Sequence, residues 1–276
     1  MPGLRAALPA ALLLLSSFPP AAARKDPGMN IPGELFELSS HDYRGNRAAN
    51  VAIQYHNHLE GSPSLVLALR EIKKAIVKVI SEYTTKFYLV FSTLFYLTGK
   101  NAGICLATVL YQKNSSPQIS IKCVDIPDKK KYQEEDRMFY HYLQHKKTPT
   151  IVHNIPDETG HIDPDVHKFW GLSVAASGYV MWKNSREDLA YNMVQIKLLK
   201  QWKTKDGVHV ELVILFHEIP TENIVKCHMQ FIWKLGDTLT PKYSCTPYYH
   251  WLEDGSGQDS KSAAGMSHEK ARHSQE

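Results

Sequence analysis

The residues whose spacing most clearly predicts chemistry in this 276-residue chain are its four cysteines: Cys105, Cys123, Cys227 and Cys245. The members of each successive pair are 18 positions apart, and the second pair follows the first by 122 positions. Four cysteines allow three disulfide pairings, but equal spacing in two places indicates a duplicated unit with one internal bridge in each copy. The alternative of free or zinc-binding thiols has no C-x-x-C spacing to support it. We therefore predict two disulfides, each closing an antiparallel hairpin.

The other chemically versatile residues form no recognisable catalytic pattern. The chain has no His-Glu-x-x-His, no Gly-x-Ser-x-Gly and no Gly-rich phosphate loop. His141 and His145 are four positions apart and could share a metal, but we interpret them as surface residues beside two lysines. His56 and His58 are two apart on a predicted helix, so their side chains diverge. We predict that the protein is not an enzyme and that it holds no metal or cofactor.

Two kinds of modification site are predicted. Asn114 begins an Asn-Ser-Ser glycosylation sequence in a predicted exposed turn, although the proline that follows disfavours its use. Ser267 and Ser274 each stand two positions before a glutamate, a spacing that resembles secretory-pathway kinase sites. A phosphate at each serine would add roughly −1.5 to −2 charges and would favour calcium or mineral surfaces. The alternative is an unmodified, solubilising tail.

The N-terminal residues predict the compartment. Arg5 precedes the apolar residues 8–15, two prolines end the run, and three alanines at 21–23 supply the small residues that a signal peptidase accepts. The run is too short to span about 30 Å of hydrocarbon. We predict a secreted chain that begins near Arg24, so that the cysteines meet an oxidising environment.

The overall composition excludes several classes of protein. It is 43% hydrophobic and 22% charged, with a mean hydropathy of −0.32, which argues against collagen, extended disorder and a polytopic membrane protein. The formal net charge of +4 is spread along the chain. Nucleic-acid binding is disfavoured, because the neutralisation of phosphates needs clustered cations.

The elements that must position these residues repeat with the same shift of 122. Residues 86–95 fall on residues 208–217 without a gap, and residues 106–111 fall on residues 228–233. These apolar runs are alternating or continuous, as is typical of half-buried strands. Each half is therefore predicted to contain four strands, of which the last two form the disulfide-closed hairpin.

One helix is predicted before the strands of each half. Apolar residues recur at helical spacing from Ala48 to Leu59, and Asp163 with Pro164 supplies an N-cap and a first-turn proline for the second helix. A third helix, which Asp128 can cap, connects the halves. The predicted fold is α+β. Its segments are a signal peptide (1–23), an N-terminal extension (24–40), domain one (41–126), a connecting helix (127–149), domain two (150–251) and a disordered polar tail (252–276).

Several short motifs, in the same order along the chain, resemble the latexin and retinoic-acid-receptor-responder family. They are Asn-Ile-Pro-Asp at 154–157, Gly-Tyr-Val-Met-Trp at 178–182, Lys-Gln-Trp-Lys-Thr at 200–204 and Leu-Phe-His-Glu-Ile at 215–219. The match looks closest to the family's avian eggshell matrix member. The resemblance implies two tandem cystatin-like domains joined by a helix, and inhibition of zinc-dependent carboxypeptidases of the A type. Inhibition of papain-like enzymes is not expected, because the chain lacks a Gln-x-Val-x-Gly loop.

The resemblance also implies where a peptidase would be contacted. In the family, a loop after the second strand of the C-terminal domain reaches the active-site funnel of the peptidase. The corresponding residues here are His217, Glu218, Ile219, Pro220, Thr221, Glu222 and Asn223. The chain departs from the pattern at the last two positions, where relatives read Gln then Glu. A carboxylate at this point could ligate a catalytic zinc or be repelled by the enzyme's own glutamate.

Two functions follow as hypotheses. The first is a secreted, monomeric inhibitor of metallocarboxypeptidases that acts by steric blockade, without nucleic-acid or membrane partners. The second is an extracellular matrix or mineral-associated (eggshell) protein with weak or lost inhibitory activity. Glu222, the polar tail and the eggshell resemblance favour this second hypothesis.

Overall fold

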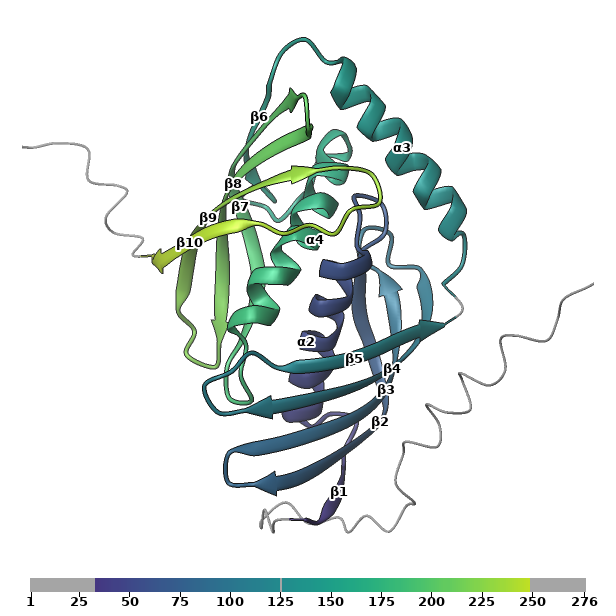
Figure 1. Ribbon diagram of the computed structural model, residues 1–276, viewed down its shortest axis with the longest axis vertical. Coiled ribbons are helices and arrows are strands. Elements are labelled where there is room, and N and C mark those ends of the chain that lie inside the picture. The colour runs from purple at the N-terminus through teal and green to yellow at the C-terminus, as the bar shows by residue number, and fades with distance from the viewer. Residues whose placement is uncertain (1–32, 125, 249–276) are drawn as a thin grey trace, which may run out of the picture.

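The computed structural model describes residues 33–124 and 126–248 (Figure 1). The predicted signal peptide and polar tail, with Ser267 and Ser274, lie outside the described residues. The described part of the chain folds into two antiparallel five-stranded sheets, three α-helices and one short 3-10 helix. None of its helices is long and apolar enough to cross a membrane.

The expectation of four strands in each half is wrong, because each sheet has five. The first sheet has the order β1-β2-β3-β4-β5, with strands Leu35–Leu38, Leu67–Ser81, Thr84–Phe95, Asn101–Gln112 and Gln118–Val124. The second has the order β10-β9-β8-β7-β6, and its strands β6 to β10 are Thr150–Ile155, Ala190–Thr204, Gly207–Ile219, Ile224–Trp233 and Lys242–Pro247. The additional strands, β1 and β6, precede the helices. They are short edge strands of four and six residues, so they carry little periodic signal.

The three helices form where apolar periodicity and N-terminal signals coincide. Helix α2 spans Tyr43–Glu60 and α4 spans His167–Asn184, directly after the 3-10 helix η1 at Pro164–Val166. As predicted, Asp163 accepts a hydrogen bond at the start of η1, from the Asp165 amide. The connecting helix α3 spans Lys129–His145, but Asp128 does not cap it with its side chain, because its backbone is left-handed at φ 56°.

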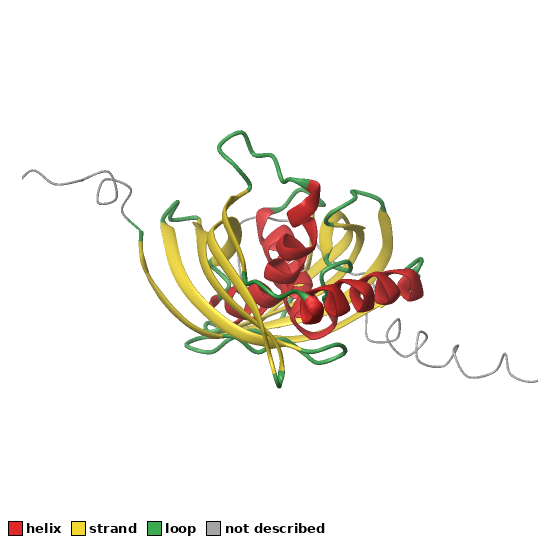
Figure 2. Ribbon diagram, turned by 90° about the horizontal axis from the view of Figure 1, so that it is seen from above, coloured by secondary structure: helices red, strands yellow, loops and turns green. Residues whose placement is uncertain are grey.

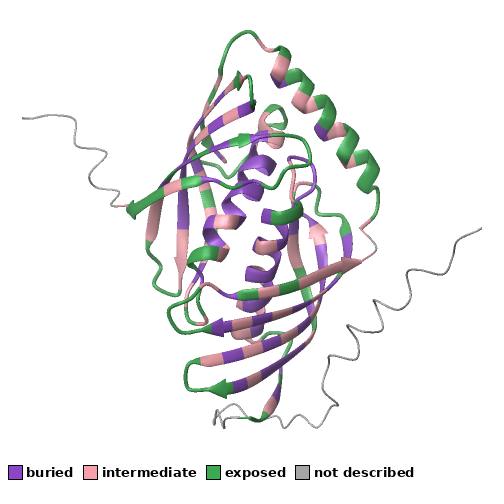
Figure 3. Ribbon diagram, in the orientation of Figure 1, coloured by how far each residue is buried: buried purple, intermediate pink, exposed green. Residues whose placement is uncertain are grey.

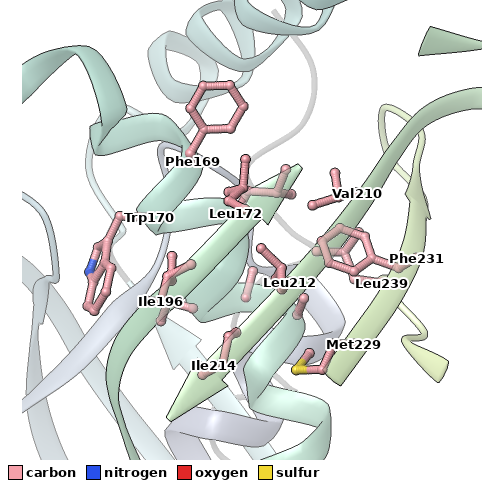
Figure 4. Close-up of a cluster of buried hydrophobic side chains, with 14 of the residues drawn as sticks. Phe169, Trp170, Leu172, Ile196, Val210, Leu212, Ile214, Met229, Phe231 and Leu239 are labelled. Atoms are coloured by element: carbon pink, nitrogen blue, oxygen red, sulfur yellow. The ribbon is translucent and has the colours of Figure 1, made fainter. Parts of the chain in front are cut away.

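Each sheet curves around one helix, and the two helices lie between the two sheets (Figure 2). On β8, the alternate residues Val208, Val210, Leu212 and Ile214 are fully buried, as the period of two requires. Figure 4 shows Leu172 of α4 and the β8 residues pointing into the same apolar cluster. An equivalent cluster joins α2 to the first sheet.

The structure contains both predicted disulfides. Cys105 stands directly opposite Cys123 in the β4–β5 ladder, and Cys227 stands opposite Cys245 in the β9–β10 ladder. The Cα atoms of the two pairs are 4.0 and 4.1 Å apart. Each bridge therefore joins the last two strands of its own sheet.

The two halves pack against each other through α2 and α4, which run side by side in opposite directions (Figure 1). The mostly exposed α3 contrasts with the central helices α2 and α4, in which most residues are buried (Figure 3). The rings of His58 and Trp182, one from each central helix, stack with centroids 5.8 Å apart. The Trp182 indole donates to Pro117 O at 2.8 Å, and the His58 ring hydrogen-bonds the backbone of Leu239.

These contacts are reciprocal. The turn of each disulfide hairpin covers the C-terminal end of the other half's helix: the Ser116 hydroxyl donates to Lys183 O at 2.8 Å, and the Thr238 hydroxyl donates to Leu59 O at 3.4 Å. The hairpin residues differ by 122 and the helix residues by 124, so equivalent positions make equivalent contacts. The duplication seen in the sequence is thus also a quasi-twofold packing of the two halves.

Candidate functional site

The seven residues implied by the family resemblance lie at one end of the second sheet. His217, Glu218 and Ile219 end β8, and residues 220–223 form the turn that leads into β9. The turn follows the third strand of its sheet, rather than the second, because β6 precedes β7. All seven side chains are partly or fully exposed, so the segment is available to a partner.

Glu218 organises this segment. Its carboxylate accepts hydrogen bonds at 2.7 Å from the hydroxyls of Tyr191 and Thr221, and the Asn223 amide donates to it at 3.5 Å. The backbone N–H of Glu218 donates to Asn223 O at 2.9 Å, and that of Glu222 donates to Glu218 O at 3.0 Å. The side chain of one strand-end residue thus connects both sides of the turn, which restricts its conformations.

The same contacts connect the segment to the other half of the protein. Tyr191 stands opposite Glu218 in the β7–β8 ladder. Its carbonyl oxygen accepts a hydrogen bond of 2.7 Å from the Gln54 amide of α2. Tyr191 therefore links the turn, through Glu218, to Gln54 of α2.

These hydrogen bonds shift the acidity of both side chains. The hydroxyls of Tyr191 and Thr221 lower the pKa of Glu218, which keeps it ionised at neutral pH. Burial, assisted by the negative charge of Glu218, raises the pKa of the Tyr191 hydroxyl. Tyr191 therefore stays protonated and donates.

Glu222 occupies an unusual backbone position. Its φ is 60°, a left-handed conformation that favours glycine. The β3–β4 turn of the first half has a glycine at the position that makes the same hydrogen bond: Gly99, with φ 65°, donates to Phe95 O as Glu222 donates to Glu218 O. The Glu222 carboxylate lies 2.8 Å from the His217 ring nitrogen and remains highly exposed.

The other candidate residues lie apart from this segment. Asn114 is exposed in the β4–β5 turn, as expected for a sequon. The His145 ring contacts the backbone oxygen of His141 at 2.8 Å rather than sharing a ligand with it. Within the described ranges, no three His, Cys, Asp or Glu side chains are grouped to bind a metal.

A cavity of about 510 Å³ lies between the C-terminal end of α2, α3 and the β9–β10 turn. Its lining includes the buried residues Leu65, Trp233 and Asp136. Burial raises the pKa of Asp136, although hydrogen bonds from Ser62 and Ser64 oppose the shift. Since the Ser64 hydroxyl donates directly to Asp136, we interpret this group as fastening α3 to the first half.

Tyr191 and Gln54 were not anticipated from the sequence. Tyr191 lies 27 positions from Glu218, and Gln54 lies 137 positions from Tyr191. Neither pair belongs to a short motif. Tyr191 could have been identified only from the register of β7 against β8, which places it opposite Glu218. That register depends on two β-bulges in β7, and the sequence contains no clear signal for them.

Sequence comparisons find a matching family and several similar proteins. Residues 38–250 match the family model described as Latexin. Ovocalyxin-32 of Gallus gallus is 50% identical over 270 residues, which cover 98% of each chain. Retinoic acid receptor responder protein 1 of Homo sapiens is 32% identical over 231 residues, covering 79% of this chain and 76% of that protein. Latexin of Homo sapiens is 31% identical over 201 residues, covering 71% and 90% respectively. This chain therefore belongs to the latexin family.

Proposed function

We propose that the protein is a secreted inhibitor of A-type zinc metallocarboxypeptidases, built from two cystatin-like halves, and that residues 217–223 enter the active-site cleft. Family membership supports the class of function, and the exposed, internally hydrogen-bonded β8–β9 turn supports the location. The Glu218 network is the observation that carries the proposal. It holds the turn in shape before any partner arrives.

Such a turn suits the task for two physical reasons. A preorganised loop loses little conformational entropy on binding, so more of its contact energy appears as affinity. A carboxypeptidase also requires the free carboxylate of a chain end. A turn held between two strands offers no chain end, so it can fill the cleft without being cleaved.

In this proposal, the interaction between the turn and the catalytic zinc of the peptidase depends on Glu222. Its exposed carboxylate lies beside His217. In the cleft it would either bind the zinc or be repelled by the enzyme's own glutamate. Replacing Glu222 by glutamine keeps the shape of the side chain and removes its charge, so the sign of the effect identifies which interaction operates.

The test is a titration of carboxypeptidase A with the purified protein, its Glu222→Gln variant and Asp206→Asn as a matched control. Asp206 is exposed in the turn at the opposite end of β8. We expect wild type and Asp206→Asn to inhibit equally and Glu222→Gln to differ. Unchanged turnover at micromolar wild-type protein would refute the proposal. Equal inhibition by all three proteins would show that the charge of Glu222 does not contribute to the contact with the peptidase.

We also propose a second role, in an extracellular or mineralised matrix. The match to ovocalyxin-32 covers 98% of this chain, so it extends beyond the family region 38–250 into both ends. Phosphorylated Ser267 and Ser274 would give the tail its affinity for calcium. Binding to calcium carbonate, measured with and without residues 253–276, tests this role. Tail-independent or absent binding would contradict it.

A further inference from the structure

The quasi-twofold packing creates two equivalent surfaces, of which α3 covers only one. The covered surface lies at the C-terminal end of α2, where residues 59–62 meet residues 235–237 of the β9–β10 turn. Its equivalent lies at the C-terminal end of α4 and comprises residues 183–186 and residues 113–115 of the β4–β5 turn, next to the contact between Ser116 and Lys183. We call this second region the basic surface. No element of the described chain covers it as α3 covers its equivalent.

The charges of the two surfaces are opposite. The covered surface contains Glu60 and Asp237, whose equivalents on the basic surface are the uncharged Asn184 and Ser115. In the other direction, three uncharged positions of the covered surface, Leu59, Ser62 and Leu235, are replaced by cations. Their equivalents are Lys183, Arg186 and Lys113. At two of these positions the basic surface loses a negative charge and at three it gains a positive one, which distinguishes the two surfaces.

The three cations of the basic surface are available to a partner. Lys183, Arg186 and Lys113 are exposed, and none forms a salt bridge within the described part of the chain. Lys183 and Lys113 instead lie over the rings of Trp182 and Tyr83. Two carboxylates are close in sequence, the exposed Asp188 and the half-buried Glu187, which leaves a net charge of +3 − 2 = +1.

The backbone beneath these cations is fixed. The Ser116 hydroxyl donates to Lys183 O, and the Trp182 indole donates to Pro117 O, both at 2.8 Å. The β4–β5 turn is also held by the Cys105–Cys123 bridge. The positive groups therefore project from a rigid base, which lowers the entropic cost of binding at this surface.

We propose that the basic surface binds an acidic polypeptide segment of a partner protein. The covered surface provides the physical precedent, since its occupant, α3, is a polypeptide helix that pairs its own charge with one of opposite sign on the surface. Lys129 of α3 donates to Glu60 at 3.2 Å. An external segment with carboxylates would find cations in place of the acidic groups around α3. This interaction does not depend on inhibition of a carboxypeptidase.

Asn114 lies within the basic surface, so a glycan on it would block access. The experiment therefore uses the secreted chain from residue 24 onward with Asn114→Gln. The probe is fluorescent poly-L-glutamate of about 20 residues, and its anisotropy is measured at low and at physiological salt. The double variant Lys183→Ser/Arg186→Ser is compared with Lys203→Ser/Lys205→Ser, which removes two lysines near the β7–β8 turn at the other end of the second sheet.

We expect salt-sensitive binding of the probe that weakens about tenfold in Lys183→Ser/Arg186→Ser, since two exposed charge contacts are lost. The Lys203→Ser/Lys205→Ser control should bind as the parent does. Equal weakening in both double variants would show diffuse electrostatic attraction and overturn the proposal. The absence of poly-glutamate binding would also overturn the proposal. A fluorescent heparin fragment serves as a second probe, and a protein that binds heparin but not poly-glutamate would likewise contradict a polypeptide partner. Measurement of carboxypeptidase inhibition on the same proteins reports separately on the proposed inhibitory function.

Discussion

Replacing Gly171 by alanine tests how tightly the two halves are packed. Gly171 lies in α4 where this helix meets the turn after α2. An added Cβ atom would lie 2.9 Å from the Pro63 carbonyl carbon and closer still to its oxygen. Cβ atoms essentially never approach other atoms this closely. The obstacle is backbone, so the halves must move apart rather than a side chain rotating away.

The expected cost follows from two opposing effects. Overpacking against a fixed backbone costs about 3 kcal/mol, and alanine recovers about 1 kcal/mol of helix propensity relative to glycine. The predicted net loss is about 2 kcal/mol. With a urea m-value of about 2 kcal/mol per molar, the unfolding midpoint should fall by about 1 M. Tryptophan fluorescence is a suitable signal, because Trp182 lies at the contact between the helices.

Gly45→Ala provides the matched control. Gly45 is a buried glycine of α2, but an added Cβ there meets only side-chain carbons, of Ala75 at 3.3 Å, Ile72 at 3.5 Å and Leu38 at 3.7 Å. The contact at Ala75 requires a shift of only a few tenths of an ångström, so the gain in helix propensity should offset it and stability should be nearly unchanged. If Gly171→Ala unfolds at the same urea concentration as Gly45→Ala, the close packing of the halves described above is wrong.

Three further predictions concern the turn, the histidines and the disulfides. Glu222→Gly should raise the free energy of unfolding by about 0.5–1 kcal/mol, because glycine relieves the left-handed backbone at φ 60°; chemical denaturation measures this change. Burial lowers the pKa of His56 and His58 below 6.5 in the folded state. As the pH falls, these histidines are protonated in the unfolded chain before they are protonated in the folded protein, which favours unfolding. The midpoint temperature of thermal unfolding should therefore be constant above about pH 6.5 and decrease at lower pH. Removing the Cys227–Cys245 bridge by replacing both residues with serine should lower stability by about 3 kcal/mol, as measured in urea without reductant.

Each of these predictions has a discriminating outcome. Asn114→Gly, at another left-handed position with φ 61°, should stabilise less than Glu222→Gly, because asparagine tolerates this conformation better than glutamate does. A His58→Gln variant should lose less stability than wild type between pH 7 and 5; an identical pH profile would contradict the assignment to His58. A cysteine double variant as stable as the oxidised wild type would contradict the loop-entropy argument.

The cysteine spacing was sufficient to predict both disulfides and the duplication, because a hairpin bridge is a local feature with a fixed sequence separation. The Asp163 cap was predictable for the same reason. Strands β1 and β6 were not predicted, since a strand of four to six residues at a sheet edge is specified by its neighbour more than by its own pattern. The Asp128 cap failed because a left-handed backbone at that residue directs its side chain away from the first turn.

The sequence alone determined what depends on local spacing: a tandem chain of two similar halves, the pairing of its cysteines, and the family to which its motifs point. Only the tertiary structure determined what depends on contacts across more than a hundred positions. It brought the Tyr191 hydroxyl to Glu218 and the Gln54 amide to the Tyr191 carbonyl. It also placed α3 on one of the two quasi-equivalent surfaces. Local patterns record the preferences of single strands and helices. The choice between two similar surfaces depends on charge and packing after the halves have come together.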